Sequence, residues 1–274
     1  MGLGERDFET LQGLVKEHAA IVLEPSKAYL VETRLAPLAL REGIESIEVL
    51  VERLRNTHFG PLHAKVVDAM TTSETSFFRD FHPFEALRKT ILPELIRRRE
   101  GQRKLHIWCG ASSSGQEPYT IAMLLNEDFP QLREWSVTLL ATDISEEMLA
   151  RARSGRFSPL EVNRGLPSPL LVRYFKRDGA EWQLEEDVRR LVQFRPLNLV
   201  KAWPPMPPLD LIFLRNVLIY FDLEARRKIL GRIRQALEPD GYLFLGATET
   251  TLHADDAFER VAVERSWAYC LRRS

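Results

Sequence analysis

The stretch from Leu209 to Asp222 constrains the fold of this chain more than any other. It begins with a largely apolar run, Leu209–Leu214, which stops at Arg215-Asn216. A short apolar run of this kind predicts a strand that is buried on both faces of a sheet. The guanidinium of Arg215 and the amide of Asn216 would then lie at the carboxyl edge, where open α/β sheets bind their ligands. Because burying an unpaired guanidinium is costly, Arg215 either reaches solvent, meets an anionic ligand or pairs with a nearby acid.

Short apolar runs alternate with helical stretches from about residue 105 onward. The runs that predict strands are Leu105–Trp108, Val137–Ala141, Leu191–Phe194, Leu209–Leu214, Leu243–Leu245, Phe258–Ala262 and Trp267–Leu271. The stretches that predict helices are Glu117–Phe129, Ser145–Arg153 and Leu223–Leu237. This alternation indicates a parallel sheet with crossover helices. A close reversal at Glu264-Arg265-Ser266 would make the last strand antiparallel, and the turn-rich residues 174–194 predict a small hairpin insertion.

The first third of the chain has the apolar period of helices and no strand pattern. Breaks in this period fall at Glu24-Pro25-Ser26, Glu42-Gly43 and Phe59-Gly60-Pro61. We therefore predict a helical domain over residues 1–70, a linker over 71–84 that forms a lid at the sheet's carboxyl edge, and an α/β domain over 85–274. Within the last, residues 174–194 would form a small β-subdomain. Arg97-Arg98-Arg99 is expected at the C-terminus of a helix, in water.

The composition is that of an ordinary soluble globular protein. Apolar residues make up 45% and charged residues 28%, and the formal net charge is −1, so no global field recruits nucleic acid or an anionic membrane. Two cysteines make no disulfide framework, which suits a reducing compartment. Because the sequence shows neither a secretion signal nor a membrane-spanning apolar run, we expect a cytoplasmic protein without membrane insertion. The six histidines lack metal-ligand spacing, and we expect no metal.

The loop after the first predicted strand, Cys109–Pro118, is rich in glycine and small residues, which let a backbone approach a ligand closely. It lacks the Gly-Lys-Ser/Thr of a phosphate-binding P-loop and the Gly-x-Gly-x-x-Gly of a dinucleotide fold. Instead, Glu117 places a negative charge at the start of the next helix. A carboxylate there repels a phosphate but attracts an ammonium group, such as the one in the methionine part of S-adenosylmethionine.

Polar residues also follow the second and third predicted strands. Asp143 stands where a Rossmann-like fold reaches the two ribose hydroxyls of a nucleoside, although Asp143 or Ser145 could equally cap a helix. Asn198, beside Leu199, could hydrogen-bond and sandwich an adenine, or be an ordinary loop residue. Upstream, Thr71–Glu74 has the pattern of a capping box that opens a helix.

These segments together resemble the CheR-type chemotaxis receptor methyltransferases, a family of protein-glutamate O-methyltransferases, over nearly the whole chain. The resemblance is carried by Thr71–Asp80, Trp108–Met123, Ala141–Gly155, Phe213–Asp222 and Leu237–Glu249. The string Arg-Asn-Val-Leu-Ile-Tyr-Phe-Asp together with Gly-Gln-Glu-Pro-Tyr is highly specific. The resemblance implies a Rossmann-like S-adenosylmethionine-dependent methyltransferase sheet, mostly parallel with an antiparallel last strand, an N-terminal helical domain and a small antiparallel β-subdomain.

Carried over residue by residue, the resemblance also implies which side chains form the site. The implied cofactor contacts are Ser73, Thr75, Arg79, Glu117, Asp143, Asn198, Leu199, Arg215 and Asn216. The residues implied to face the methyl-transfer centre are Arg79, Arg215 and Tyr220. Ser73 stands where the family often has Asn, and Gln116 where Glu is common. Both substitutions keep hydrogen-bonding ability.

The resemblance implies that the methyl acceptor is a glutamate side chain on the cytoplasmic helices of a chemotaxis receptor, with S-adenosylhomocysteine as the second product. A solvated glutamate has a pKa of about 4.3, so it is ionised at neutral pH and needs no general base. One of the two arginines, Arg79 or Arg215, would hold this carboxylate while the other favours the cofactor's own carboxylate. The alternatives are a catalytically inactive cofactor-binding regulatory module and a methyltransferase for a non-receptor carboxylate.

Two features bear on how a receptor would dock. Lys27, Arg34 and Arg41 recur at a sevenfold spacing that keeps them on one helix face, which suits acidic receptor helices or simply solvent. The segment Arg177–Glu186 is shorter than in family members that grip a receptor's C-terminal pentapeptide. This argues against tethering through that pentapeptide.

Overall fold

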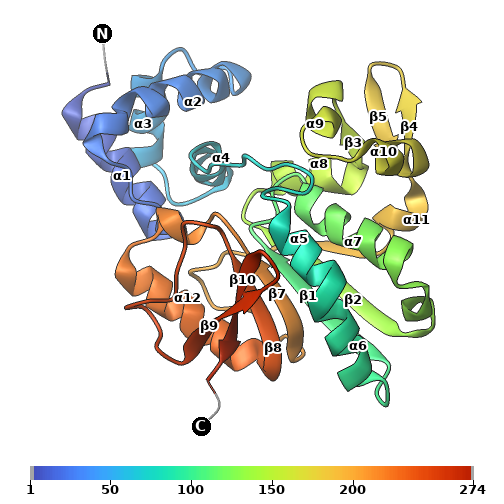
Figure 1. Ribbon diagram of the computed structural model, residues 1–274. Coiled ribbons are helices and arrows are strands. Elements are labelled where there is room, and N and C mark those ends of the chain that lie inside the picture. Colours follow the sequence, from blue (N-terminus) through green and yellow to red (C-terminus); the bar gives the residue numbers. More distant parts are fainter. Residues whose placement is uncertain (1–2, 273–274) are drawn as a thin grey trace. The chain divides into compact units, whose positions relative to one another are not determined.

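A computed structural model describes residues 3–272, which form two units (Figure 1). One unit, here called the helical unit, consists of the chain up to Thr72 together with Tyr220–Arg226. The other, here called the sheet unit, consists of Ser73–Ile219 and the chain from Arg227 onward. The chain therefore leaves the sheet unit for seven residues, counted from 220 to 226, before it returns.

The helical unit confirms the predicted helical region. Its helices are α1 (Glu5–Ala19), α2 (Ala28–Arg41), α3 (Ile47–Arg55) and α4 (Pro61–Ala69), with a 3-10 turn at Pro25–Lys27. Their apolar faces meet in a core that includes Leu11, Val15, Leu35, Leu50 and Val66, all fully buried. The returning segment joins this unit by backbone pairing, because the N–H of Val22 donates to the carbonyl of Tyr220 at 3.3 Å.

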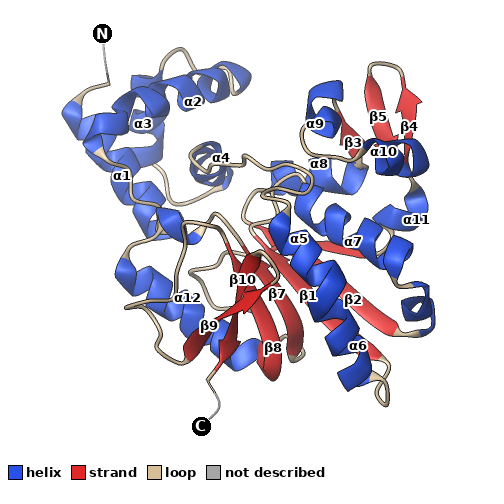
Figure 2. Cartoon of the chain, viewed as in Figure 1, coloured by secondary structure: helices blue, strands red, loops and turns tan. Residues whose placement is uncertain are grey.

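The sheet unit is built on seven strands in the order β6-β2-β1-β7-β8-β10-β9. The strands are β1 (Lys104–Gly110), β2 (Ser136–Asp143), β6 (Val192–Pro196), β7 (Leu209–Leu214), β8 (Leu237–Leu245), β9 (Phe258–Val263) and β10 (Ser266–Leu271). The first five run parallel to one another, and β10 runs antiparallel between β8 and β9. Every predicted strand is thus confirmed, including the antiparallel last one, and Figure 2 shows them in red.

β7 lies in the middle of this sheet, and all six of its residues are buried, as its apolar composition predicted. β8 begins earlier than expected, directly after α12. The register with β7 shifts between Leu209↔Leu237 and Leu211↔Tyr242, so a bulge absorbs the extra residues of β8. Sequence period could not indicate this bulge.

Helices connect and cover the strands of the sheet unit. They are α5 (His82–Ala86), which continues through a π-helical turn (Leu87–Ile91) into α6 (Leu92–Arg99), α7 (Gln116–Asp128), α8 (Glu146–Ser154), α9 (Pro159–Asn163), α10 (Ser168–Tyr174), α11 (Glu186–Arg189) and α12 (Leu223–Ala236). Short 3-10 turns lie at Pro130–Glu134 and Leu218–Tyr220. Figure 1 shows α6 and α7 lying across β1 and β2.

A second, three-stranded antiparallel sheet has the order β3-β5-β4. The predicted hairpin is formed by β4 (Phe175–Asp178) and β5 (Glu181–Leu184), and β3 (Arg156–Phe157) completes the sheet. β3 was not predicted because two residues are too few to show a period. Phe77 packs edge-on against Phe157 and Phe175, which ties the segment before α5 to this small sheet.

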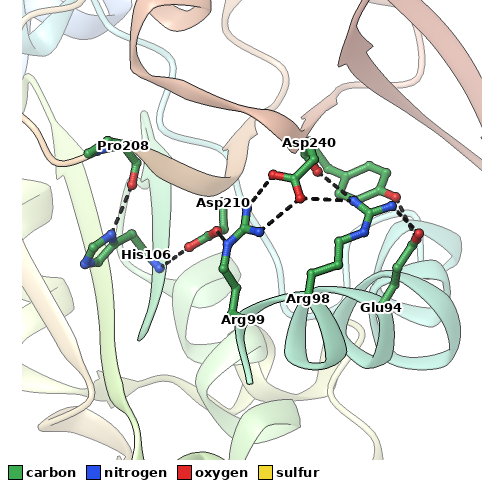
Figure 3. Close-up of polar contacts among 8 residues, drawn as sticks. Glu94, Arg98, Arg99, His106, Pro208, Asp210 and Asp240 are labelled. Carbon is green, nitrogen blue, oxygen red and sulfur yellow. Dashed lines mark hydrogen bonds and ion pairs between the residues drawn. The ribbon is translucent and has the colours of Figure 1, made fainter. Parts of the chain in front are cut away.

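The expectation that all of Arg97-Arg98-Arg99 stays in water is wrong for Arg99. Arg97 is exposed, but Arg99 is buried and its Nε donates to Asp210 at 2.6 Å while its Nη atoms donate to Asp240 (Figure 3). The other oxygen of Asp210 accepts the backbone N–H of His106 at 2.8 Å. A buried acid near the amino end of β7 requires such partners, because an unpaired charge there would be strongly destabilising.

None of the helices within residues 3–272 combines the length and the apolar character needed to cross a lipid bilayer.

Candidate functional site

Four of the predicted site residues, Glu117, Asp143, Arg215 and Asn216, lie at or just after the carboxyl ends of β1, β2 and β7. β1 pairs with both neighbours near its end, with Cys109 opposite Ala141 on one side and Phe213 on the other. The following loop turns sharply into α7 at Gly115, whose φ of +93° favours glycine. A Cβ at Gly110 would lie 2.7 Å from Cδ1 of Leu214, so a larger residue here would require the side chain of Leu214 to shift.

Asp143 lies at the end of β2 and is 9% exposed. Its carboxylate accepts the backbone N–H of Ser113 at 2.8 Å and that of Ser145 at 2.9 Å. Ser145 in turn caps α8 by accepting the N–H of Met148 at 3.1 Å. The carbonyl of Asp143 accepts the N–H of Leu197 at 2.9 Å. Asp143 therefore joins the loop after β1, the start of α8 and the segment after β6.

Arg215 is buried at the end of β7, with its side chain only 1% exposed. Its Nη1 donates to Oε2 of Glu117 at 2.7 Å, and its Nη2 donates to Oδ2 of Asp80 at 2.6 Å and to the carbonyl of Arg79 at 3.1 Å. Its Nε is buried without a partner, and the guanidinium lies over the ring of Phe84. Of the possibilities left open by the sequence, pairing with acids of the protein is the one the structure contains.

Glu117 is the acid at the start of α7. Burial raises the pKa of its carboxyl group, and the neighbouring guanidinium of Arg215 opposes this rise. The position in the first helical turn favours the ionised form, since the helix dipole is positive there. Glu117 and Arg215 thus form a pair of opposite charges that is largely withdrawn from water.

The segment before α5 carries Ser73, Thr75 and Arg79. Oγ of Ser113 donates to the carbonyl of Ser73 at 2.6 Å, and Nη1 of Arg79 donates to the carbonyl of Glu74 at 2.9 Å. Thr75 and Arg79 line a cavity of about 410 Å³ formed by residues 74–80 with Arg164 and Gly165. This segment therefore lies against the loop after β1.

The capping-box prediction for Thr71–Glu74 is wrong. Residues 72–76 form no helix, and the carboxylate of Glu74 pairs instead with Arg164 at 2.6 Å. Three non-glycine residues that follow, Phe78, Asp80 and Phe81, have φ values of 48°, 64° and 49°. Such a cluster of left-handed residues stores strain and needs strong tertiary contacts to persist. The bonds from Arg215 to Arg79 and Asp80 are contacts of this kind.

Asn198 and Leu199 lie after β6, in contacts of their own loop. Oδ1 of Asn198 accepts the N–H of Val200 at 3.0 Å. Leu199 is buried, and its carbonyl accepts from Nε1 of Trp203 at 3.1 Å and from Nη1 of Arg232 at 2.8 Å. These bonds fix the loop, and the role of both residues toward an adenine stays a prediction.

Asn216 has a φ of +59°, and the carboxylate of Glu249 holds it there. Oε2 of Glu249 accepts the N–H of Asn216 at 2.7 Å and that of Gly246 at 2.6 Å, while Oε1 accepts the N–H of Ile219 at 3.3 Å. A Cβ at Gly246 would lie 2.6 Å from Nδ2 of Asn216, so these two loops touch closely.

Sequence reasoning missed two acids of this site, Asp80 and Glu249. Both stand within segments that carry the family resemblance, Thr71–Asp80 and Leu237–Glu249, but neither has a local pattern of its own. Asp80 is 135 positions from its partner Arg215, and Glu249 is 33 positions from Asn216. Residues that pair over such separations form no local period or motif in the sequence, so the pairing could not be predicted.

Tyr220 belongs to the helical unit, where its carbonyl accepts the N–H of Val22. Its predicted place at the methyl-transfer centre stays a prediction. In the same unit, Nη1 of Arg34 donates to the carbonyls of Met70 and Thr71 at 2.8 and 3.0 Å, so this arginine secures the end of the unit. The side chain of Lys27, predicted to share its face, lies outside the described atoms.

No group of three or more His, Cys, Asp or Glu side chains in the described part of the chain could hold a metal ion. Cys109 is fully buried in the core, where burial raises the pKa of its thiol well above the usual value. A thiol of this kind is a packing group rather than a nucleophile.

Comparison with known proteins places the chain in a family. Residues 6–71 match the family model of the CheR methyltransferase all-alpha domain, and residues 73–267 match that of the CheR methyltransferase SAM binding domain. The chain is 43% identical to chemotaxis protein methyltransferase 1 of Pseudomonas aeruginosa, over 95% of this chain and 96% of that protein. It is 41% identical to chemotaxis protein methyltransferase Cher2 of Pseudomonas putida, with the same coverage.

A third relative, the chemotaxis protein methyltransferase of Vibrio parahaemolyticus, is 39% identical over 98% of both chains. The similarity thus extends over both units and leaves no large region unmatched. Because the two family models cover nearly the whole chain, and full-length relatives match at this level, the chain belongs to the CheR methyltransferase family.

Proposed function

We propose that the protein transfers a methyl group from S-adenosylmethionine to glutamate side chains of chemotaxis receptors and forms glutamate methyl esters. The observation that carries this proposal is that the matched SAM binding domain contains Asp143 and the Glu117–Arg215 pair at the carboxyl edge of its sheet. The names of the relatives support receptors of the chemotaxis system as substrates. Chemistry on a carboxylate is our own assignment.

The donor set of the site suits the parts of S-adenosylmethionine. Asp143, at the end of β2, would accept hydrogen bonds from the ribose hydroxyls, and the loop with Asn198 and Leu199 would border the adenine. The amino acid end of the cofactor carries both an ammonium and a carboxylate. The Glu117–Arg215 pair offers the two complementary charges side by side, 2.7 Å apart, which suits such a zwitterion.

We assign the two arginines different roles. Two acids and a carbonyl of the protein already occupy Arg215, so it serves the cofactor end and the loop around Asp80. The side chain of Arg79 is partly exposed and donates to the backbone carbonyl of Glu74, with no ion pair within residues 3–272, so it is the better placed cation for a substrate carboxylate.

The chemistry then needs little beyond alignment. Bound S-adenosylmethionine would supply a methyl group attached to a positively charged sulfur. After transfer of the methyl group, this sulfur is the neutral thioether of S-adenosylhomocysteine. A glutamate carboxylate is ionised at neutral pH, so one of its oxygens can attack without losing a proton. Arg79 would hold the other oxygen and fix the direction of approach, which is where proximity and orientation lower the barrier. Too tight a clamp would stabilise the ground state and slow the reaction.

The test is methyl transfer from labelled S-adenosylmethionine to purified cytoplasmic fragments of chemotaxis receptors from the same cell. A glutamate ester releases its methyl group as methanol in mild base, whereas an N-methyl group does not. Fragments in which each labelled Glu is replaced by Gln serve as controls and should lose the label. Base-stable label would contradict the carboxylate assignment. Binding of S-adenosylhomocysteine without any methyl transfer would indicate a regulatory module instead.

A further inference from the structure

A second cavity of the sheet unit shares Arg215 and Asp80 with the site. It measures about 280 Å³ and lies among the start of α5, the loop after β8 and the β9–β10 hairpin. The hairpin contributes Arg260, Arg265 and Trp267 to its lining. Because β9 ends and β10 begins at the same edge as the end of β8, these side chains stand at the carboxyl edge of the sheet.

The charges of the hairpin are sorted between its two faces. Arg260 and Arg265 line this cavity, whereas Glu259 and Glu264 line a separate groove beside α6, where Glu264 accepts from Oγ1 of Thr90 at 2.9 Å. Successive residues of a strand point to opposite faces, which separates Glu259 from Arg260 on β9, whereas Glu264 and Arg265 are separated by the turn between the two strands. The result is a basic face toward the site and an acidic face away from it.

The two arginines of this face are not neutralised by the protein. Both are exposed, and within residues 3–272 neither forms an ion pair, while the guanidinium of Arg260 lies 4.1 Å from the ring centroid of Trp267. The acids of the cavity are engaged elsewhere, Asp80 by Arg215 and Glu249 by three backbone N–H groups. The cavity mouth therefore carries two exposed guanidinium groups that pair with no acid of the described chain.

Trp267 is 50% exposed although its ring is large and apolar. Tryptophan and arginine are the residue types most enriched at the energetic centres of protein interfaces. An exposed tryptophan flanked by free arginines, next to a substrate site, matches a protein segment that carries carboxylates and some apolar surface.

We propose that Arg260, Arg265 and Trp267 bind an acidic residue that neighbours the methyl-accepting glutamate in the substrate protein, and so select glutamates in acidic surroundings. This inference rests on the proposed function, because it takes the acceptor to be a protein carboxylate beside Arg215. On a substrate helix, the neighbouring acid would stand one turn away from the acceptor, on the same face.

The test uses the full chain saturated with S-adenosylhomocysteine and two fluorescein-labelled helical peptides. One peptide has a central Glu with Glu one turn before and after it, and the other has Lys at both flanking positions. The variants are Arg260→Glu, Arg265→Glu and their combination. Arg133→Glu is the matched control, because Arg133 is also exposed but precedes β2 at the opposite edge of the sheet.

We expect the double reversal to weaken binding of the acidic peptide, measured by fluorescence anisotropy, by about tenfold or more, and to strengthen binding of the lysine peptide. Arg133→Glu should change neither affinity, and S-adenosylhomocysteine should bind all variants equally. Should a reversal impair folding, the neutral pair Arg260→Gln and Arg265→Gln should still lower the preference for the acidic peptide.

Equal affinity of the native chain and the double reversal for the acidic peptide would overturn the inference, as would a native chain that binds neither peptide. The outcome is separable from that of the proposed function. If the protein discriminates between the peptides but methylates no receptor fragment, the inference about the basic face stands and the proposed reaction is rejected. If methyl transfer occurs but does not depend on the flanking charge, the proposed reaction stands and the inference about the basic face is rejected.

Discussion

Glu117 is the site residue whose ionisation depends most on its surroundings. Burial raises the pKa of its carboxyl group, so this group takes up a proton at a higher pH than an ordinary glutamate does. If Glu117 binds the cofactor's ammonium, only the ionised carboxylate can do so. The affinity for S-adenosylhomocysteine should therefore fall as the pH is lowered, beginning above the ordinary pKa of 4.5.

Isothermal titration of S-adenosylhomocysteine between about pH 5 and pH 7, below the range of about 7.7–8.0 in which an α-amino group titrates, measures this dependence. In Glu117→Gln the affinity should be lower at neutral pH, and it should no longer depend on pH in this window. A variant that keeps the pH dependence of the native chain would assign that dependence to another group.

Arg79→Ala tests the division of roles between the two arginines. We expect a higher KM for receptor fragments with little change in the affinity for S-adenosylhomocysteine, because Arg79 is assigned to the substrate carboxylate. Loss of a charged hydrogen bond costs about 1.5–3 kcal/mol, which is roughly a tenfold to hundredfold rise in KM. Arg79→Lys should recover part of it. An equal loss of product affinity would place Arg79 on the cofactor instead.

At the scale of single residues, the sequence predicted which residue types lie at the strand ends, but not which residues they pair with. Arg215 could be placed at the end of a buried strand from the apolar run before it. Its partners Asp80 and Glu117 stand 135 and 98 positions away, so only the folded chain brings them together. The exposed place of Arg97 was foreseeable from its helix, whereas the burial of Arg99 depends on acids in two distant strands.

At the scale of elements, the Arg99 network joins the end of α6 to β7 and β8 at the edge opposite the site. Arg99→Ala would leave Asp210 buried without its charged partner and should lower the free energy of unfolding by about 3–5 kcal/mol. Arg97→Ala, two residues earlier and exposed, should change it by no more than about 0.5 kcal/mol. Urea unfolding followed by tryptophan fluorescence measures both values.

The pH dependence of this network has a definite sign. The hydrogen bond from Arg99 lowers the pKa of Asp240 below its usual 3.8. A carboxyl group with a lowered pKa in the folded state stabilises above its ordinary pKa and loses this contribution as the pH falls through the folded value. Arg99→Ala should therefore be less sensitive to acid than the native chain in that range. If Arg99→Ala and Arg97→Ala lowered the free energy of unfolding at neutral pH by similar amounts, the structural role of Arg99 would be contradicted.

The loop between β7 and α12 depends on one acid in another loop. Glu249→Ala would leave the buried N–H of Gly246 and the partly buried N–H of Asn216 without an acceptor, at a cost of about 1–3 kcal/mol for the buried group and less for the other. Because Asn216 is held at a positive φ by this bond, we expect lower affinity for S-adenosylhomocysteine as well as lower stability. Glu249→Gln keeps one acceptor oxygen and should recover part of both losses, and Glu259→Ala on exposed β9 is the control. Unaltered product affinity in Glu249→Ala would remove Asn216 from the site.

At the scale of the whole molecule, the positions of the main strands and the helical first third followed from two periods in the sequence, one for each unit, whereas the order of the strands in the sheet was not predicted. The alternation beyond residue 105 was sufficient for the sheet because each strand is apolar and each crossover is helical. The membership of residues 220–226 in the helical unit was not predicted, since the backbone bond between Val22 and Tyr220 has no signature in side-chain pattern. β3 of the small sheet was not predicted because a strand of two residues is too short to show a period.

The division of the chain into two units also predicts which unit a bound ligand stabilises. Every predicted cofactor contact lies at 73–216, within the sheet unit, so S-adenosylhomocysteine should stabilise that unit. At a free concentration of about 100 times its Kd, a ligand that binds only the folded state adds about 2.7 kcal/mol. Differential scanning calorimetry should show the transition that carries the sheet unit moving upward with ligand. In Asp143→Ala the same concentration should give a smaller shift, because a ribose contact is lost.

Adenosine diphosphate should not shift this transition, since Glu117 opposes a phosphate at the start of α7. A shift with the diphosphate as large as that with the thioether would mean that the loop after β1 binds phosphates, and the sulfonium chemistry proposed for this edge would have to be abandoned.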